Sequence, residues 1–329
     1  MDHEEPKISR LESARKWIGI FSISRILRWT LIFLTLWWLL VNAHRDRTFN
    51  QLANRYTNAS SRFIEVDGMM AHCQIVGKGQ PIILLHDAQN SLQTWSAWAD
   101  TLSDKYQVIR VDLPGFGLTG PHPMGSYSAF MYVGFLDSLA QKLGLNKFIL
   151  AGNGLGAQIA WQYAAEKPSR IDKLILLSPE GFEKKSSSWV TMLASTPVLN
   201  RIIWEVSPRS FMRIYLEDVY ADDGLVTDSL VDKHFELFLR SGNRKAFTDR
   251  ASVRDNRPPV DELIKKITAK TLILWGAEDT RISPEYAYEF HLRIKTSDLR
   301  IYPNTGHWPQ EENPKKTAED VRAFLEGRF

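Results

Sequence analysis

Short apolar runs alternate with helical stretches from Arg62 to the C-terminus, and this alternation constrains the fold more than any other feature. The apolar runs have the length of buried strands and lie at 81–85, 108–112, 148–151, 174–177, 271–275 and 299–302. The helical stretches between most of them are 127–143, 155–166, 284–294 and 314–324. Such an alternation predicts an α/β fold with a mainly parallel sheet covered by helices on both faces.

Two further features complete the predicted core. Asp67-Gly68 separates the runs 63–66 and 69–75, and an Asp-Gly pair between apolar runs is a strong hairpin signal. The alternation breaks between two strands, where residues 181–258 are helical and rich in aromatic residues. We expect this insertion to form a helical lid over the edge where open α/β sheets bind ligands. The core itself is then 62–180 together with 259–329.

The N-terminal segment has an apolar run from Trp29 to Val41 that contains no charge, and the run extends to 26–43 if Arg28 snorkels. At 1.5 Å per residue it is roughly 27 Å long, enough to cross a bilayer core. Residues 1–25 form a basic leader with an apolar stripe that fits an interfacial helix, and polar residues 44–61 are expected to be a linker. An excess of basic residues before the span favours a cytoplasmic N-terminus and an extracytoplasmic main domain.

Two other interpretations of this segment remain open. A cleaved signal peptide would fit the small residue Ala43 with Val41 two positions before it, although the charged leader is long for a signal peptide. A buried core helix is the second alternative, and the polar stretch that follows disfavours it. We therefore predict a single-pass membrane protein held by a signal anchor.

Charge and cysteine content exclude several classes of function. Lys and Arg number 41 against 38 Asp and Glu, so no concentrated basic face for a nucleic acid is expected. The single cysteine, Cys73, forms no internal disulfide and no Cys-based metal site. Gly152, Gly154 and Gly156 lack the spacing of a dinucleotide fingerprint. We predict no metal, no cofactor and no nucleic-acid partner.

Five motifs stand at strand ends, in register with this pattern. They are Leu84-Leu-His86, Val111-Asp-Leu-Pro-Gly-Phe-Gly117, Gly152-Asn-Gly-Leu-Gly156, Trp275-Gly-Ala-Glu-Asp279 and Asn304-Thr-Gly-His-Trp308. In this order they resemble the α/β-hydrolase superfamily over roughly residues 62–329. The resemblance implies ester or carbon–carbon-bond hydrolysis, in which an elbow serine attacks a carbonyl, a histidine takes its proton and an acid orients the histidine.

The resemblance places the acid at Asp279 and the base at His307, but the nucleophile position holds Gly154. Glycine has no side chain, and the neighbouring Asn153 faces the wrong way in the family geometry. A covalent acyl-enzyme therefore cannot form at this position. Asp279 as a helix N-cap and His307 as an ordinary loop histidine are the structural alternatives for the pair.

A second departure lies in the turn after His86, where the family has glycine and this chain has Asp87. The oxyanion N–H groups would come from Ala88 and Leu155. A carboxylate about 4 Å from the developing charge would oppose it by roughly 4 kcal/mol at an effective dielectric near 20. Asp87 would otherwise be protonated, or be a surface turn residue pointing to solvent.

Three functions follow from these residues. The first is a hydrolase-fold protein without hydrolysis that binds a lipophilic small molecule, an acyl ester or a protein partner, with Asp87, Asn153 and Trp308 at the ligand site. The second is an inactivated variant of an active carboxylic-ester hydrolase, with the elbow serine replaced. The third uses His307 and Asp279 as a general base without covalent catalysis. Because two separate departures coincide, we favour the first.

Overall fold

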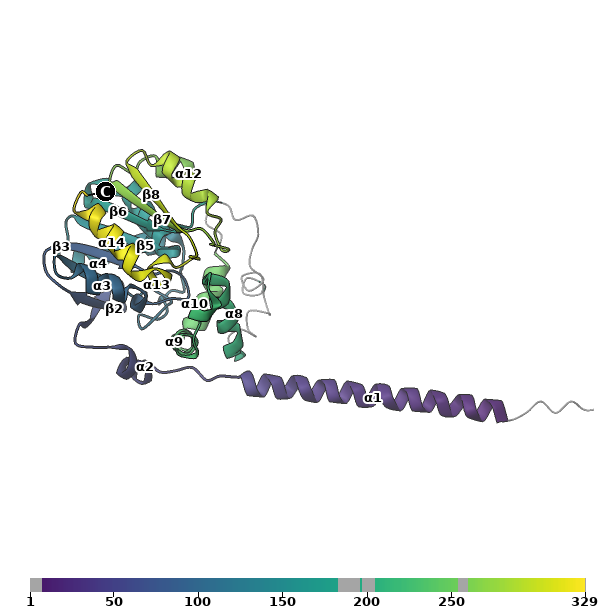
Figure 1. Ribbon diagram of the computed structural model, residues 1–329. Coiled ribbons are helices and arrows are strands. Elements are labelled where there is room, and N and C mark those ends of the chain that lie inside the picture. Colours follow the sequence, from purple (N-terminus) through teal and green to yellow (C-terminus); the bar gives the residue numbers. More distant parts are fainter. Residues whose placement is uncertain (1–7, 183–195, 197–204, 254–259, 329) are drawn as a thin grey trace, which may run out of the picture.

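The computed structural model describes residues 8–182, 196, 205–253 and 260–328. The described residues form one eight-stranded sheet in the order β1-β2-β4-β3-β5-β6-β7-β8 (Figure 1). The strands are β1 (Ser61–Val66), β2 (Met69–Val76), β3 (Gln80–Leu85), β4 (Tyr106–Val111), β5 (Phe148–Asn153), β6 (Ile171–Leu177), β7 (Lys270–Gly276) and β8 (Ser297–Tyr302). β2 pairs antiparallel with β1 and β4, and all other pairs are parallel. The predicted mainly parallel sheet is confirmed.

Helices cover both faces of this sheet. One face packs against α4 (Ala129–Lys142), α5 (Leu155–Glu166), α11 (Val260–Ile264) and α12 (Glu285–Arg293). The other packs against α3 (Ser96–Leu102) and α14 (Pro314–Leu325), the latter preceded by the short helix α13 (Pro309–Glu312). Short 3-10 turns occur at Leu92–Trp95, Pro168–Arg170 and Asp223–Leu225.

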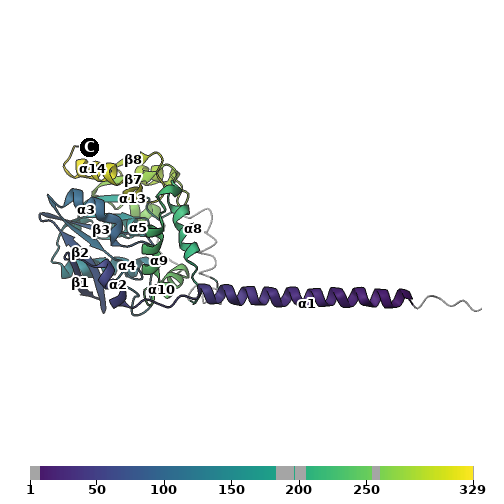
Figure 2. The same ribbon diagram turned by 60° about the horizontal axis from the view of Figure 1, so that its bottom comes forward.

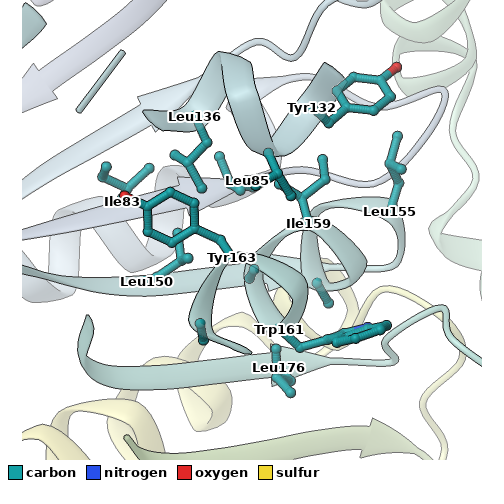
Figure 3. Packing of buried hydrophobic residues seen from close by; sticks show 14 of the residues in the cluster. Ile83, Leu85, Tyr132, Leu136, Leu150, Leu155, Ile159, Trp161, Tyr163 and Leu176 are labelled. Atoms are coloured by element: carbon teal, nitrogen blue, oxygen red, sulfur yellow. The ribbon is translucent and has the colours of Figure 1, made fainter. Parts of the chain in front are cut away.

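Strand β3 shows why its sequence is apolar throughout. Ile83 and Leu85 pack into one hydrophobic cluster, whereas Ile82 and Leu84 pack into the cluster on the opposite face. Figure 3 shows the first cluster, in which Ile83 and Leu85 lie close to side chains of α5. Both faces of a central parallel strand are buried, so a continuous apolar run replaces the alternation seen in half-exposed strands.

The first two strands form the predicted hairpin. Val66 pairs with Met69, and the two residues between them have positive φ angles of 49° at Asp67 and 78° at Gly68. Two left-handed residues are what a two-residue hairpin turn of this twist requires, and Asp-Gly adopts it at low cost.

The N-terminal part is a single long helix, α1 (Ile8–Asn42), which projects from the body in Figures 1 and 2. Its residues Arg25–Asn42 are long and apolar enough to cross a membrane by length and composition, and none of this stretch is buried in the protein. A signal sequence would pass the same test. Residues 1–7 of the expected leader lie outside the described residues.

The stretch that we expected to be a linker contains a further helix, α2 (Phe49–Tyr56). Thr48 caps it by accepting from the Gln51 N–H, while the Gln51 side chain accepts from the Thr48 N–H. Leu52 is buried against the core, so the segment is anchored rather than free. The Thr-x-x-Gln spacing is visible in the sequence and could have predicted this helix.

The insertion between β6 and β7 contains α8 (Arg209–Val219), α9 (Asp228–Phe238) and α10 (Asn243–Ala251). Buried side chains of α8 and α9 form a separate hydrophobic cluster that includes Trp308 from the core, whereas Ala246 of α10 packs into the main core cluster. Figures 1 and 2 place these helices beside the end of α1, where the Ser207 N–H donates to the Asn42 carbonyl. Parts of the predicted lid, residues 183–195, 197–204 and 254–259, lie outside the described residues.

Candidate active site

The sharp turn between β5 and α5 places Gly154 at the carboxyl end of the central strand. Its φ of 52° and ψ of −113° lie outside the regions that non-glycine residues occupy without strain. On either side, a Cβ on Gly152 would come 2.2 Å from the Gly156 backbone, and a Cβ on Gly156 would come 2.2 Å from the Leu85 carbonyl oxygen. The flanking glycines therefore allow the turn to pack closely against β3.

The carboxylate of Asp87 occupies the space above Gly154. A Cβ built on Gly154 would lie 2.0 Å from Asp87 Oδ1 and 2.3 Å from its Cγ. Oδ1 accepts from the Leu155 N–H at 2.8 Å, and Oδ2 accepts from the Trp308 indole N–H at 3.1 Å. In the predicted arrangement this is the place of the nucleophile's side chain, and the Leu155 N–H is one of the two predicted oxyanion donors.

The alternative in which Asp87 is a surface turn residue is therefore wrong, because Asp87 is only 3% exposed. The left-handed residue of this turn is Gln89, with φ of 60°. His86 holds the backbone of this turn against the loop after β4. The His86 ring bonds the Asp87 carbonyl oxygen through Nδ1 at 2.6 Å and accepts from the Leu113 N–H through Nε2.

His307 and Asp279 lie together, as a catalytic pair would. Nδ1 of His307 is 2.8 Å from Asp279 Oδ2, and both side chains are nearly fully buried. Asp279 follows β7, and its Oδ1 accepts from the N–H groups of Arg281 and Ile282. On the other side of the ring, His307 Nε2 lies 3.2 Å from Asp87 Oδ2. The imidazole is thus held between two carboxylates.

This arrangement fixes the charges of the site. Burial acts to lower the pKa of His307, but the carboxylates of Asp279 and Asp87 outweigh it and raise that pKa to about 9. Burial acts to raise the pKa of Asp87, but His307 and the Leu155 and Trp308 N–H groups hold it well below its usual range. Both directions favour an imidazolium beside an ionised Asp87 and oppose the protonated form of Asp87.

The other predicted ligand and oxyanion residues lie in the same region. Trp308 is fully buried, stacks with His234 of α9 and donates to Asp87. Asn153 is buried with its amide donating to the Leu177 and His307 carbonyls and accepting from Gln310, so its amide holds the site together. The role of Asn153 toward a ligand stays a prediction, as does that of the Ala88 N–H.

Sequence reasoning missed three residues that the insertion and α13 bring to the site. The Tyr215 hydroxyl donates to the Ala88 carbonyl, and His234 Nδ1 lies 3.0 Å from the Gln89 carbonyl. Glu311 accepts from Asn90 and Thr94, so it ties the turn after β3 to α13. No motif marks these residues, because each belongs to a segment far from the turn it contacts. Within the described ranges, no group of three or more His, Cys, Asp or Glu side chains is arranged to hold a metal ion.

Comparisons with known proteins show the family and the fold. Residues 82–320 match the family described as "Alpha/beta hydrolase family". A 2-hydroxy-6-oxo-2,4-heptadienoate hydrolase of Pseudomonas putida is 27% identical over 274 residues, which are 80% of this chain and 95% of that protein. A 2-hydroxymuconate semialdehyde hydrolase of Pseudomonas sp. is 24% identical over 80% of this chain and 93% of its own length.

Solved structures show the same fold. A meta-cleavage product hydrolase of Pseudomonas fluorescens superposes with a TM-score of 0.72 and 26% identity, covering 83% of this chain and all of that one. A membrane phospholipase A, described as a bacterial virulence factor, superposes with a TM-score of 0.71 and 23% identity, covering 96% of this chain and 99% of its own. The latter likeness establishes the fold alone.

Proposed function

The chain belongs to the alpha/beta hydrolase family, and we propose that it is a membrane-anchored member that does not carry out serine-dependent hydrolysis and instead binds a lipophilic ligand. One observation carries this proposal: the Asp87 carboxylate stands where a nucleophile's side chain would stand, bonded to His307 and Leu155. The homologues are carbon–carbon-bond hydrolases and esterase-like members of the same family.

Acyl transfer by this family needs an attacking atom, a neutral base and a free oxyanion donor. Gly154 supplies no attacking atom. His307, with a pKa of about 9, is protonated at neutral pH and accepts no proton from a nucleophile or water. The Leu155 N–H already donates to Asp87 and is not free for a developing oxyanion. Asp87 thus occupies the oxyanion donor and opposes deprotonation of the base, the two components that the glycine at 154 would by itself leave intact.

The same contacts bear on the two alternatives. A variant made only to inactivate the enzyme would change the elbow, but Asp87 makes three separate contacts with Leu155, Trp308 and His307. Because Asp87 is a second departure from the family pattern and fits the site closely, it supports a natural loss of the serine rather than an introduced substitution. The general-base alternative requires His307 to lose its proton, and the ionised Asp87 beside it opposes that loss.

The ligand and the membrane are the less direct parts of the proposal. Aromatic and aliphatic side chains of the insertion pack around Trp308 next to Asp87, which supports an apolar ligand. The exposed apolar surface of Arg25–Asn42 supports a membrane anchor. The excess of basic residues before this stretch supports a main domain on the extracytoplasmic side. Retention of the full chain in membranes after alkaline carbonate washing tests the anchor, and release by that wash would contradict it.

The test of the central claim restores the missing parts one at a time. The four proteins are the wild type, Gly154→Ser, Asp87→Gly and the double variant Asp87→Gly/Gly154→Ser, each treated with a fluorophosphonate probe and medium-chain nitrophenyl esters. We expect labelling and turnover in the double variant alone, because Gly154→Ser by itself places its Cβ 2.0 Å from the Asp87 carboxylate. Labelling of the wild type, or no labelling of a folded double variant, would contradict the proposal. Circular dichroism establishes that each variant is folded.

The same carboxylate favours a second candidate function, in which Asp87 itself attacks. Oδ2 would form a bond to an epoxide carbon as the ring C–O bond breaks, and the His307 imidazolium at 3.2 Å would protonate the alkoxide. Neutral His307 would then activate water to hydrolyse the ester, yielding a diol and regenerating Asp87. Single-turnover reaction with styrene oxide in ¹⁸O-labelled water tests this function: label incorporated into the Asp87 peptide supports it, and no diol formation excludes it for this substrate.

A further inference from the structure

An open cavity of about 650 Å³ lies where α1 meets the body of the protein, away from the candidate active site. Its lining combines the segment directly after α1 with the start of α10, and includes His44, Arg45, Arg244 and Lys245. Asp46 and Glu205 are the acidic residues in its lining. A smaller cavity of about 260 Å³, lined in part by Arg45 and Arg47, adjoins the same segment.

Arg244 shows that this cavity has a built polar wall. Its side chain is 8% exposed, donates to Asp46 Oδ1 and to the His44 carbonyl, and so ties α10 to the segment after α1. The remaining guanidinium nitrogen, Nη1, is buried and has no hydrogen-bond partner among the described residues. Because Nη1 is shielded from solvent, Arg244 contributes a fixed positive charge to the wall of the cavity rather than an accessible donor.

The electrostatic balance of the cavity favours an anion. Three lining residues are cationic (Arg45, Arg244 and Lys245) and two are acidic (Asp46 and Glu205), so the lining carries one net positive charge. Asp46 is engaged by Arg244, and Lys245 pairs with Asp249. No ion pair in the described part of the chain holds the exposed Arg45. Burial, followed by the charges of Arg244 and Arg47, lowers the pKa of His44, as expected where the local potential is positive.

The position of the cavity selects one kind of anion. The apolar stretch Arg25–Asn42, at 1.5 Å per residue, spans roughly the hydrocarbon thickness of a bilayer. Residues 43–47 follow it without a gap, so they lie at the depth of the lipid headgroups if α1 crosses the membrane. Basic residues at that depth attract anionic lipids.

We propose that this cavity binds the phosphate of an anionic phospholipid headgroup, with Arg45 and Lys245 as its accessible cationic residues and the buried Arg244 as a fixed charge in its wall. The proposal rests on the membrane anchor proposed above but not on the chemistry of Asp87. A guanidinium matches phosphate oxygens in geometry and stays charged at all working pH values. A lipid held here would fix the orientation of the body relative to the bilayer.

The test uses the full-length protein in neutral detergent micelles, titrated with dioctanoyl phosphatidylglycerol, dioctanoyl phosphatidylcholine or inorganic phosphate. We expect phosphatidylglycerol to raise the melting temperature saturably through mass action, and phosphatidylcholine to have no such effect. The variant Arg45→Gln/Lys245→Gln should weaken phosphatidylglycerol binding at least tenfold, while Lys78→Gln, which removes an exposed charge elsewhere, should not change it. Arg244 is left in place because its contacts hold α10 to the segment after α1.

Three outcomes would overturn the proposal. The first is that phosphatidylcholine stabilises the protein as much as phosphatidylglycerol does, and the second is that Arg45→Gln/Lys245→Gln binds phosphatidylglycerol as tightly as the wild type. The third is that inorganic phosphate binds as tightly as the lipid, which would assign the cavity to free phosphate. The membrane anchor is tested separately, by floating the wild type with pure phosphatidylcholine vesicles. If the wild type does not float with these vesicles, the membrane anchor is wrong. The active-site proposal is independent, because these variants should not change fluorophosphonate labelling of Asp87→Gly/Gly154→Ser.

Discussion

Replacing Asp87 with Asn removes one of the two carboxylates that hold the His307 imidazolium. The rise in the His307 pKa from 6.5 to about 9 corresponds, at 1.36 kcal/mol per pKa unit, to about 3 kcal/mol of stability linked to its protonation. Because the folded pKa is the higher one, this stability is fully present below pH 6.5 and is lost as the pH rises through about 9. The wild type should therefore become less stable across that range.

The Asn variant should lose part of that dependence. Asp279 is the larger of the two charge contributions and remains, so we expect the His307 pKa to fall but to stay above its ordinary value, and the pH-linked stability to decrease with it. At pH 6 the variant should be about 2 kcal/mol less stable, since a buried imidazolium has lost a partner 3.2 Å away. At pH 9.5 most of that difference should vanish because His307 is then neutral in both proteins.

Urea unfolding at pH 6, 7.5 and 9.5 measures the stabilities, and the NMR titration of the His307 ring measures the pKa. The exposed residue Asp100 gives a matched control, because Asp100→Asn makes the same chemical change away from the imidazole. An unchanged His307 pKa in Asp87→Asn would refute the ion pair and, with it, the argument that Asp87 keeps the base protonated. A destabilisation equal at all three pH values would mean that Asp87 acts through packing rather than charge.

Three further predictions concern the scaffold around the site. Gly156→Ala should destabilise the fold by more than about 2 kcal/mol, since its Cβ would lie 2.2 Å from the Leu85 carbonyl oxygen. Gly134→Ala, at an open position inside α4, should instead stabilise the fold by about 0.5–1 kcal/mol. The denaturant midpoints of the two variants compare these effects. The thiol of Cys73 is fully buried, and burial raises its pKa. A disulfide reagent should therefore label Cys73 only in urea, and rapid labelling of the native protein would contradict this prediction. Thr48→Ala removes the cap of α2 and should cost about 1 kcal/mol, measured as a lower urea midpoint, and an unchanged midpoint would mean that α2 adds nothing to stability.

The sheet could be predicted because its determinants are local. Each buried parallel strand must be apolar on both faces, so runs such as 81–85 and 271–275 are recognisable within a few residues. The helix 155–166 was predicted with the bounds that the structure shows. Helix α3 was missed because it follows a 3-10 turn at Leu92–Trp95 and has no extended amphipathic pattern.

The pair Asp279 and His307 could be predicted because the family's order of motifs is carried by short segments at strand ends. The position of the Asp87 side chain could not. Whether a turn aspartate faces solvent or the site depends on Leu155 and Trp308, which are 68 and 221 residues further along the chain. The turn's own sequence is compatible with either orientation, so only the folded arrangement distinguishes them.

Asp87 and Gly154 are consequently one feature of the molecule rather than two. A serine at 154 would overlap the carboxylate that now lies 2.0 Å from its Cβ position, and an aspartate at 87 would overlap the side chain of such a serine. Asp87 in this orientation is therefore compatible with the site only when residue 154 is glycine. Two residues in contact that exclude each other's alternatives have coupled, non-additive effects on stability. Neither substitution alone restores the family's arrangement, which is why the absence of a serine in the sequence understates how far this site has diverged from a serine hydrolase.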